Sequence, residues 1–473
     1  MSAMSAGVSE TVEPGWAEFG RQLRCHRRRA GLTQVQLGRR VGYHHTFISR
    51  LEGGLREPPF GLVCRLDVVL ETGGRLAAAL AAPRHVPPAP GRNLTAPTLF
   101  SPLPGADSPG DETPPVFSWW PDRLPAEGLA CPLHGTAGCA VPDQSEAAVL
   151  LKGATGPFDG AGEAAGAESD LLHGLTACLA CLIREAFVQP TGACAATVER
   201  LLRGVVRWAE AVDSAGRLPY GQLRLAAQYA QVAGRLRMEQ GQSGVAMAWF
   251  GQGLRWADAV QDASARATLL SDVCTLVRLD GDIASTLVYA EAIGAVDAKR
   301  RWMALLGDLY QARAYALRQD AAECRRHITS ARRRFARLDD RDRLEVPWLA
   351  GAEGVLRLES AIGGALRDLS AATGDRAAAR RAIEATAQSC ALLPPLMRTT
   401  RVLLTLRLAD SWACAGDPVA AVALAQPVLA EAMRSRELMI AAELRGLRSR
   451  IAGRWGDLPE VRERRERLGD ASG

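Results

Sequence analysis

The sequence contains almost no lysine and few histidines. Lys152 and Lys299 are the only lysines among 473 residues, and neither follows a glycine, so the Gly-Lys-Ser/Thr core of a P-loop is absent. The His-Glu-x-x-His motif of zinc proteases is also missing, and GQSGV has Val245 where a Gly-x-Ser-x-Gly nucleophile motif needs its second glycine. With only seven histidines in the chain, we expect no catalytic residues, no enzymatic activity and no cofactor.

Long apolar stretches and a secretion signal are missing as well. No uncharged apolar run approaches the roughly 18 residues that a membrane-spanning helix requires. The first 15 residues are small, polar and acidic, without the cationic start and apolar centre of a signal peptide, and we expect them to be disordered. The eleven cysteines are odd in number and scattered, unlike a disulfide framework. We therefore expect a cytoplasmic, nucleoid-associated protein without membrane contact.

Aromatic residues are also scarce, at 5% of the chain against 48% hydrophobic residues, so the interior must consist mostly of Ala, Leu and Val. This composition favours packed helices and predicts an all-α protein, long enough for about two to four folding units. Residues 16–80 hold 11 arginines against five acidic residues, whereas the net charge of the whole chain is only +5. A basic domain attached to a near-neutral body is typical of a phosphate-binding module.

Within this basic region, LTQVQLGRRVGYHHTFISRLEGG predicts two short helices around a tight turn. A preceding helix runs from about residue 16 to a stop at Gly31. Thr33 and Gln36 then form a capping box at the start of a helix over 34–41, with Leu32 and Leu37 as a hydrophobic staple. The next helix follows after a connection of about three residues, which is the helix-turn-helix arrangement.

In that next helix, Ile48 and Leu51 face inward, so the outer face carries polar residues that can enter the major groove of DNA. The candidate reading residues on this face are His45, Thr46, Ser49 and Arg50. Arg50 can bind guanine in a bidentate manner, which makes it the main candidate for base discrimination. The alternative is that the two histidines, His44 and His45, are simply exposed polar residues. A metal site at these histidines would need further ligands, and the other candidates in this domain are Cys25, His26 and Cys64.

The region from Phe19 to about Leu70 resembles the Xre or phage-repressor (Cro/C1-type) helix-turn-helix family, through AGLTQVQLGRRVG, ISRLEGG and REPP followed by a helix with Leu62, Leu66 and Val69. The resemblance implies a five-helix DNA-binding domain over 16–82. It also implies a phosphate contact by Gln34, base contacts by His45, Thr46 and Arg50, and a backbone contact by Arg56. The family usually has Ser or Thr where this chain has His44, and often Gln or Arg where it has His45, so its base preference does not transfer.

Residues 83–144 contain 14 of the 26 prolines, which predicts an extended linker between two domains. Within it, CPLHGTAGC offers Cys131, His134 and Cys139 as zinc ligands, although their spacing is not a familiar one and a fourth ligand would have to come from His173, Cys178 or Cys181. A redox-sensing role and a turn-rich segment docked on the next domain are the alternatives, and we favour the docked segment, without metal.

Two further groups near the linker have structural interpretations. Phe117, Trp119 and Trp120 interrupt the polar linker and are expected to anchor it on the helical body, with a short partner-binding motif as the alternative. Cys178 and Cys181 lie in a helical pattern, so we expect them to be small residues of the core.

Residues 145–473 show repeated helix breaks. Similar turns occur at Gly241, Gly281, Gln319, Gly374, Gly416 and Gly456, and a mostly small residue follows each turn. A period near 40 residues resembles tetratricopeptide-type repeats, which implies an α-helical solenoid with a groove. The longest interval contains Pro347, which predicts an insertion or a bend there.

The two resemblances together imply an actinobacterial type of transcriptional regulator. In this interpretation the protein binds double-stranded DNA as a homodimer, and a peptide or protein effector binds in the repeat groove. A body that serves only for dimerisation is one alternative. The other is a protein-interaction scaffold whose helix-turn-helix domain has lost DNA binding.

Overall fold

The computed structural model describes residues 17–41, 43, 45–54, 60–76, 99–100, 103–104, 116–155, 165–186, 191–395, 397–435 and 437–455. The chain divides into two compact units, Met1–Thr95 and Ala96–Gly473. In the described residues both units are helical, and their only sheet pairs β1 (Arg123–Leu124) antiparallel with β2 (Cys139–Ala140). The all-α fold predicted from the composition is confirmed. None of the described helices has the length and apolar character needed to cross a bilayer.

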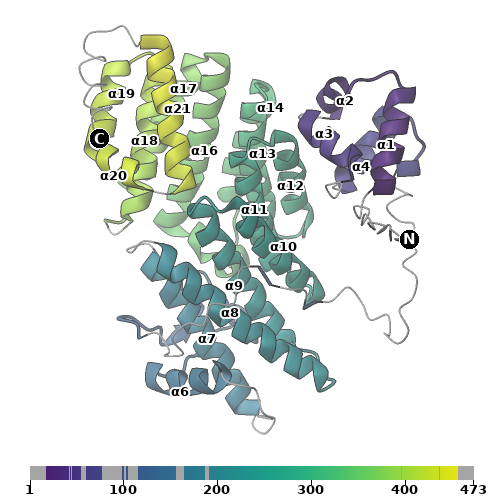
Figure 1. Cartoon of the computed structure of the whole chain (residues 1–473). Coiled ribbons are helices and arrows are strands. Elements are labelled where there is room, and N and C mark those ends of the chain that lie inside the picture. The colour runs from purple at the N-terminus through teal and green to yellow at the C-terminus, as the bar shows by residue number, and fades with distance from the viewer. Residues whose placement is uncertain are drawn as a thin grey trace, which may run out of the picture. The chain divides into compact units, whose positions relative to one another are not determined.

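The N-terminal unit contains α1 (Ala17–Arg29), α2 (Gln34–Val41), α3 (His45–Glu52) and α4 (Phe60–Val69) (Figure 1). These bounds agree with the helices predicted from capping signals and periodicity. A fifth helix was expected in this domain; residues 75–76 are helical, and the residues that follow them lie outside the described part of the chain.

Local sequence signals explain how the first two helices meet. Gly31 adopts the left-handed conformation (φ 67°) that ends α1, and the amide of Leu32 donates to the carbonyl of Arg27, closing a Schellman turn. The predicted capping box is present. The backbone N–H of Gln36 donates to Thr33 Oγ1 at 3.1 Å, and the backbone N–H of Thr33 donates to the side-chain Oε1 of Gln36 at 2.9 Å. The start of α2 is therefore fixed by its own sequence.

The core of this unit gathers apolar residues from all four helices: Phe19, Leu23, Leu37, Ile48, Leu51, Leu62 and Leu66 are buried. Val69, which follows Leu62 and Leu66 in the same helix, is only partly buried. Two glycines permit close backbone packing. A Cβ on Gly20 would lie 2.6 Å from the carbonyl oxygen of Leu51, and one on Gly38 would lie 2.4 Å from that of Tyr43. The tight turn between α2 and α3 thus depends on the missing side chain at Gly38.

The second unit contains a succession of helices. They are α6 (Gln144–Thr155), α7 (Ala165–Ala186), α8 (Thr191–Ser214), α9 (Tyr220–Glu239), α10 (Ser243–Ala259), α11 (Ala263–Leu279), α12 (Ile283–Ala295), α13 (Arg301–Leu317), α14 (Ala321–Phe335), α15 (Asp340–Glu345), α16 (Gly351–Thr373), α17 (Arg376–Ala391), α18 (Arg398–Ala415), α19 (Pro418–Ala425), α20 (Leu429–Arg434) and α21 (Leu438–Trp455). Consecutive helices pack side by side from α8 to α14 and from α16 to α19, and α9, α11, α13, α16 and α18 also contact one another in turn (Figure 1).

The predicted helix breaks are the turns within helix pairs. Gly241, Gly281, Gln319, Gly374 and Gly416 all have positive φ. In four of these five turns the next residue is an aspartate whose side chain accepts a backbone amide of the following helix, which is an N-cap. Gly456 lies outside the described residues.

The small residue predicted after each break is completely buried in every described case: Ala246, Thr286, Cys324, Ala379 and Ala421 have no exposed surface. A small side chain at this point lets the two helices of a pair approach closely. The longest interval between breaks contains the short helix α15 and a 3-10 turn, Pro347–Leu349, which is the insertion predicted from Pro347. Val461, after the last break, lies outside the described residues.

Residues 116–143, which lie inside the expected linker, pack against the helices of the second unit, as the favoured interpretation of a docked segment predicted. Phe117 is buried in its core, and Trp119 and Trp120 pack against the same core, as expected for anchoring residues. On α9, Arg224 donates to the carbonyl of Pro132 at 2.7 Å, and Gln228 donates to that of Ala130 at 3.0 Å. The proline content indicated an extended chain, and the structure adds that side chains of α9 satisfy the carbonyls of this irregular segment.

Helix α21 joins a buried network of charged residues. Glu443 lies 2.7 Å from Arg367 of α16 and 3.0 Å from Arg407 of α18. Asp410 of α18 pairs with Arg367 at 2.5 Å and with Arg450 of α21 at 2.6 Å. Because α21 also contacts α9 and α11, it lies across the first helices of several pairs.

Candidate nucleic-acid interface

Helix α3 presents one apolar and one polar face. Ile48 and Leu51 have no exposed surface, whereas His45 and Ser49 are exposed and lie one helical turn apart. Thr46 and Arg50 belong to the same helix, but their side chains are outside the described part of the structure. The predicted division of α3 into an inward and an outward face is confirmed for the four side chains that are described.

A buried ion pair fixes α3 against α1. The guanidinium of Arg27 binds both carboxylate oxygens of Glu52, with its Nε on Oε1 and its Nη2 3.0 Å from Oε2. Its Nη1 donates to the carbonyl of Leu32 at 2.7 Å, at the entrance to α2. The side chain of Glu52 has no exposed surface. One guanidinium therefore connects the end of α1, the start of α2 and the end of α3.

Gln34, the predicted phosphate ligand at the start of α2, joins the same network. Its Nε2 donates to Glu52 Oε2 at 2.9 Å. An amide nitrogen carries two hydrogens, so one bond to Glu52 leaves a second donor for a phosphate oxygen. The Glu52 carboxylate thus holds the side chain of Gln34 against the end of α3.

The surroundings of Glu52 keep its carboxylate charged. Burial raises its pKa, but hydrogen bonds from Arg27 and Gln34 and the charge of Arg24 outweigh burial and hold the pKa below its usual value. Arg24 lies 3.4 Å from Glu52 and is half exposed. Glu52 was not predicted to be part of the site. The sequence signal that could have identified it is a carboxylate at the end of the reading helix in a domain whose first helix is rich in arginine.

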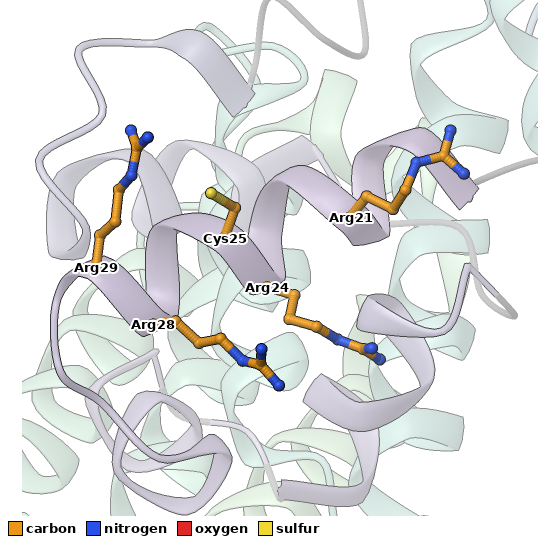
Figure 2. A pocket seen from close by; sticks show the side chains of 5 residues that line it. All are labelled: Arg21, Arg24, Cys25, Arg28 and Arg29. Carbon is orange, nitrogen blue, oxygen red and sulfur yellow. The ribbon is translucent and has the colours of Figure 1, made fainter.

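Helix α1 carries a basic surface that the prediction also omitted. A shallow hollow of ≈ 480 Å³ is lined by Arg21, Arg24, Cys25, Arg28 and Arg29 (Figure 2). Figure 2 shows Arg24 and Arg28, one helical turn apart, extending from the same side of the helix. Two of these arginines are partly neutralised, Arg21 by Glu18 at 2.7 Å and Arg24 by Glu52 at 3.4 Å, but the excess of arginine still creates a positive potential that attracts phosphate.

The remaining predicted residues of this domain are not described. Arg56 lies in the segment 55–59 and His44 precedes α3, and both are outside the described residues. The structure therefore brings Gln34, His45 and Ser49 to one region of the domain, and the sequence alone adds Thr46, Arg50 and Arg56.

A second cluster of functional side chains lies in the other unit. Cys131, His134 and Cys139 come together with His173 of α7, so that one ligand atom from each lies within 4.8 Å of the others. Cys178 and Cys181, the other distant candidates, are buried in the helical core, as the sequence predicted. Burial raises the pKa of the Cys181 thiol to about 12, which keeps it protonated and unreactive.

Comparison with known proteins identifies the N-terminal unit. Residues 18–80 match a family described as a helix-turn-helix domain. No curated protein and no solved structure matches the chain significantly. The match covers α1 to α4 and contains the whole network around Glu52, and it does not extend to the second unit.

Proposed function

We propose that this protein is a sequence-specific DNA-binding transcriptional regulator. The observation that carries the proposal is the outer face of α3, which is exposed and polar and is held by the Arg27–Glu52 pair within a helix-turn-helix domain of net positive charge. A reading helix must be held rigidly if its side chains are to distinguish bases. The Xre-type resemblance of this region supports the same assignment.

Each residue has a distinct role in the proposed complex. His45, Thr46, Ser49 and Arg50 contact base edges in the major groove, and Arg50 contributes most to discrimination through guanine. Gln34 and Arg56 bind backbone phosphates and set the register of α3 on the duplex. The arginines of α1 add a sequence-independent attraction to phosphate.

We infer that the second unit dimerises and senses a peptide or protein effector. The support is its repeated helix pairs with buried small residues at the crossings, which resemble tetratricopeptide-type repeats and suit a solenoid with a binding groove. In the described helices, α21 lies across α9, α11 and α18 and places Glu443 among arginines. An acidic effector segment that used this surface would compete with α21.

We assign no catalytic role to His327, a buried histidine of α14. His327 Nδ1 lies 2.8 Å from Asp308, but the hydroxyl of Ser330 donates to the same carboxylate at 2.6 Å rather than to the imidazole. A serine nucleophile requires a base that accepts its proton. The arrangement instead joins α13 to α14 through a shared aspartate.

The salt dependence of binding tests the proposal against a protein-interaction scaffold. The full chain is titrated with labelled duplex DNA at several salt concentrations, and log K is plotted against log salt. Each phosphate contact contributes a slope of about −0.9. We expect a steep negative slope that Arg56→Ala reduces by about one for every DNA sequence.

Arg341→Ala is the matched control, because it removes one positive charge from an exposed arginine of α15 in the other unit. It should leave the slope unchanged. A chain that binds DNA only weakly, with the same slope in all three proteins, would favour the scaffold with a vestigial helix-turn-helix domain.

A further inference from the structure

We propose that Cys131, His134, Cys139 and His173 bind one structural zinc ion that fastens residues 116–143 to α7. This proposal is independent of DNA binding, because its residues lie in the second unit. It revises the expectation of no metal, since the sequence alone could not show which distant residue completes the set.

The first argument is the geometry of the four ligand atoms. All lie within 4.8 Å of one another, and His134 Nδ1 is 3.4 Å from Cys131 Sγ. In tetrahedral zinc sites, with zinc–sulfur distances near 2.3 Å and zinc–nitrogen distances near 2.1 Å, neighbouring ligand atoms are about 3.3–3.8 Å apart. The Cys131–His134 pair already has this separation, and the widest pair needs to close by only about 1 Å.

The second argument is an imidazole nitrogen with no partner. His173 is 5% exposed, and its Nε2 is buried without a hydrogen bond among the described residues. The ring faces that of His134, with centroids 5.4 Å apart. A buried polar atom without a partner is unfavourable unless a ligand satisfies it, and a lone pair on neutral imidazole is a zinc ligand.

The third argument is the backbone that presents the ligands. The amide of His134 donates to Cys131 Sγ at 3.3 Å, and the amide of Gly135 donates to the Cys131 carbonyl at 2.9 Å, which closes a tight turn between the first two ligands. Cys139 is held by β2, opposite Leu124 of β1. The only described sheet of this segment has two-residue strands, so little regular secondary structure holds the turns that carry the ligands, and small elements of this kind are commonly stabilised by a metal.

The donor set selects the metal. Two thiolates and two imidazoles suit zinc, whereas calcium and magnesium require oxygen ligands, which the cluster lacks. A disulfide between Cys131 and Cys139 would use both sulfurs but would leave the two histidines without a role. One side of the site is open at His134, which is exposed, so a metal ion can enter.

The site joins two parts of the chain that are distant in sequence. Three ligands come from the turn-rich segment and the fourth from α7, whose neighbouring residues Leu172 and Leu175 belong to the core. Zinc would therefore act with the bonds from Arg224 and Gln228 to hold this segment in place. Removing the metal should make residues 116–143 more sensitive to protease while α9 to α18 stay protected.

Metal analysis of the full chain tests the proposal. The untagged protein is purified without chelator under reducing conditions, and zinc is measured per chain by mass spectrometry. We expect one zinc per chain, reduced to background in Cys139→Ser and in His173→Ala. Cys181→Ala is the matched control, since it changes another buried cysteine of α7 outside the cluster, and it should retain one zinc.

Cobalt substitution supplies a readout that does not depend on variants that fold. The unaltered chain, stripped of metal and given Co²⁺, should show the absorption of tetrahedral cobalt together with a thiolate-to-cobalt charge-transfer band. Failure of the reduced chain to bind either Zn²⁺ or Co²⁺ would overturn the proposal. So would one zinc per chain retained in both cluster variants, or a Cys131–Cys139 disulfide that persists under reducing conditions.

Discussion

Replacing Glu443 with alanine should destabilise the second unit strongly. The side chain of Glu443 is 6% exposed, and its partners Arg367 and Arg407 are 7% and 5% exposed. In Glu443→Ala both guanidinium groups remain charged and buried but lose the carboxylate that they share. The expected loss is thus the penalty for an uncompensated buried charge and not the small value of a surface ion pair.

The contacts that Arg367 and Arg407 keep in Glu443→Ala determine how much unfolding free energy is lost. Breaking a buried pair by removing one partner costs about 3–5 kcal/mol. Arg367 keeps Asp410 and Asp368, at 2.5 Å and 3.0 Å, and Arg407 keeps the carbonyl and hydroxyl of Ser360, both at 3.1 Å. Because these contacts compensate part of the charge, we expect a loss near the lower end, about 3 kcal/mol.

The same site predicts a pH dependence. Burial raises the pKa of Glu443, but Arg367 and Arg407 outweigh burial and lower it from 4.5 to about 2. Since the folded pKa lies below the unfolded one, the stabilisation is complete above pH 4.5 and is lost as the pH falls toward 2. The difference in free energy of unfolding between the unaltered chain and Glu443→Ala should therefore shrink over that interval.

Urea unfolding followed by tryptophan fluorescence measures the effect. Nine of the ten tryptophans belong to the second unit, so the signal reports its unfolding. Glu353→Ala is the control, because its carboxylate is 54% exposed and pairs with Arg357 on the surface; it should change the free energy of unfolding by less than about 0.5 kcal/mol. Equal changes in the two variants would refute the assignment of Glu443 to a buried network.

Two further predictions concern the N-terminal unit. Gly38→Ala places a Cβ 2.4 Å from the carbonyl oxygen of Tyr43, so it should destabilise the domain by about 1–3 kcal/mol and speed amide hydrogen exchange in α2 and α3. Gly244→Ala is the control, because nothing lies within 4 Å of the added Cβ and alanine is favoured over glycine in a helix; it should not speed exchange in α10. A chain ending at Thr95 should be a folded monomer that binds DNA more weakly than the full chain, and sedimentation showing a tight dimer would move the dimer interface to this unit.

Much of the N-terminal unit could be predicted because its signals are local. The capping box of Thr33, the stop at Gly31 and the inward pair Ile48 and Leu51 each depend on residues within one or two helical turns. The Arg27–Glu52 pair could not be predicted in the same way, because its partners are 25 residues apart and become neighbours only when α1 packs on α3.

In the second unit, the turn between α10 and α11 shows the limit of searching for glycine breaks. Gln261 adopts positive φ there and Asp262 caps α11, as Gln319 and Asp320 do before α14. The sequence analysis identified the turn at Gln319 but not the similar one at Gln261, which falls between two breaks of the 40-residue period. A non-glycine residue in the left-handed conformation gives a weak sequence signal.

The docking of the turn-rich segment was predicted, but its contacts were not. Its prolines indicated an extended chain, but composition does not show that α9 side chains satisfy its carbonyls or that His173 lies beside Cys131 and Cys139. Both facts depend on the packing of α7 and α9 against residues far away in the sequence. The spacing of cysteine and histidine indicated three candidate ligands within one segment and left His173, Cys178 and Cys181 open for the fourth, and the structure places His173 beside the other three.

Selection from genomic DNA tests the central proposal most directly. The full chain, Arg50→Ala and the control Arg341→Ala are each incubated with sheared DNA from the source organism, in the presence and absence of its cell lysate as a source of effector, and the bound fragments are sequenced. Our account predicts one two-fold-symmetric motif, present with the unaltered chain and the control and lost with Arg50→Ala. Folded protein that enriches no motif under either condition would contradict sequence-specific DNA binding.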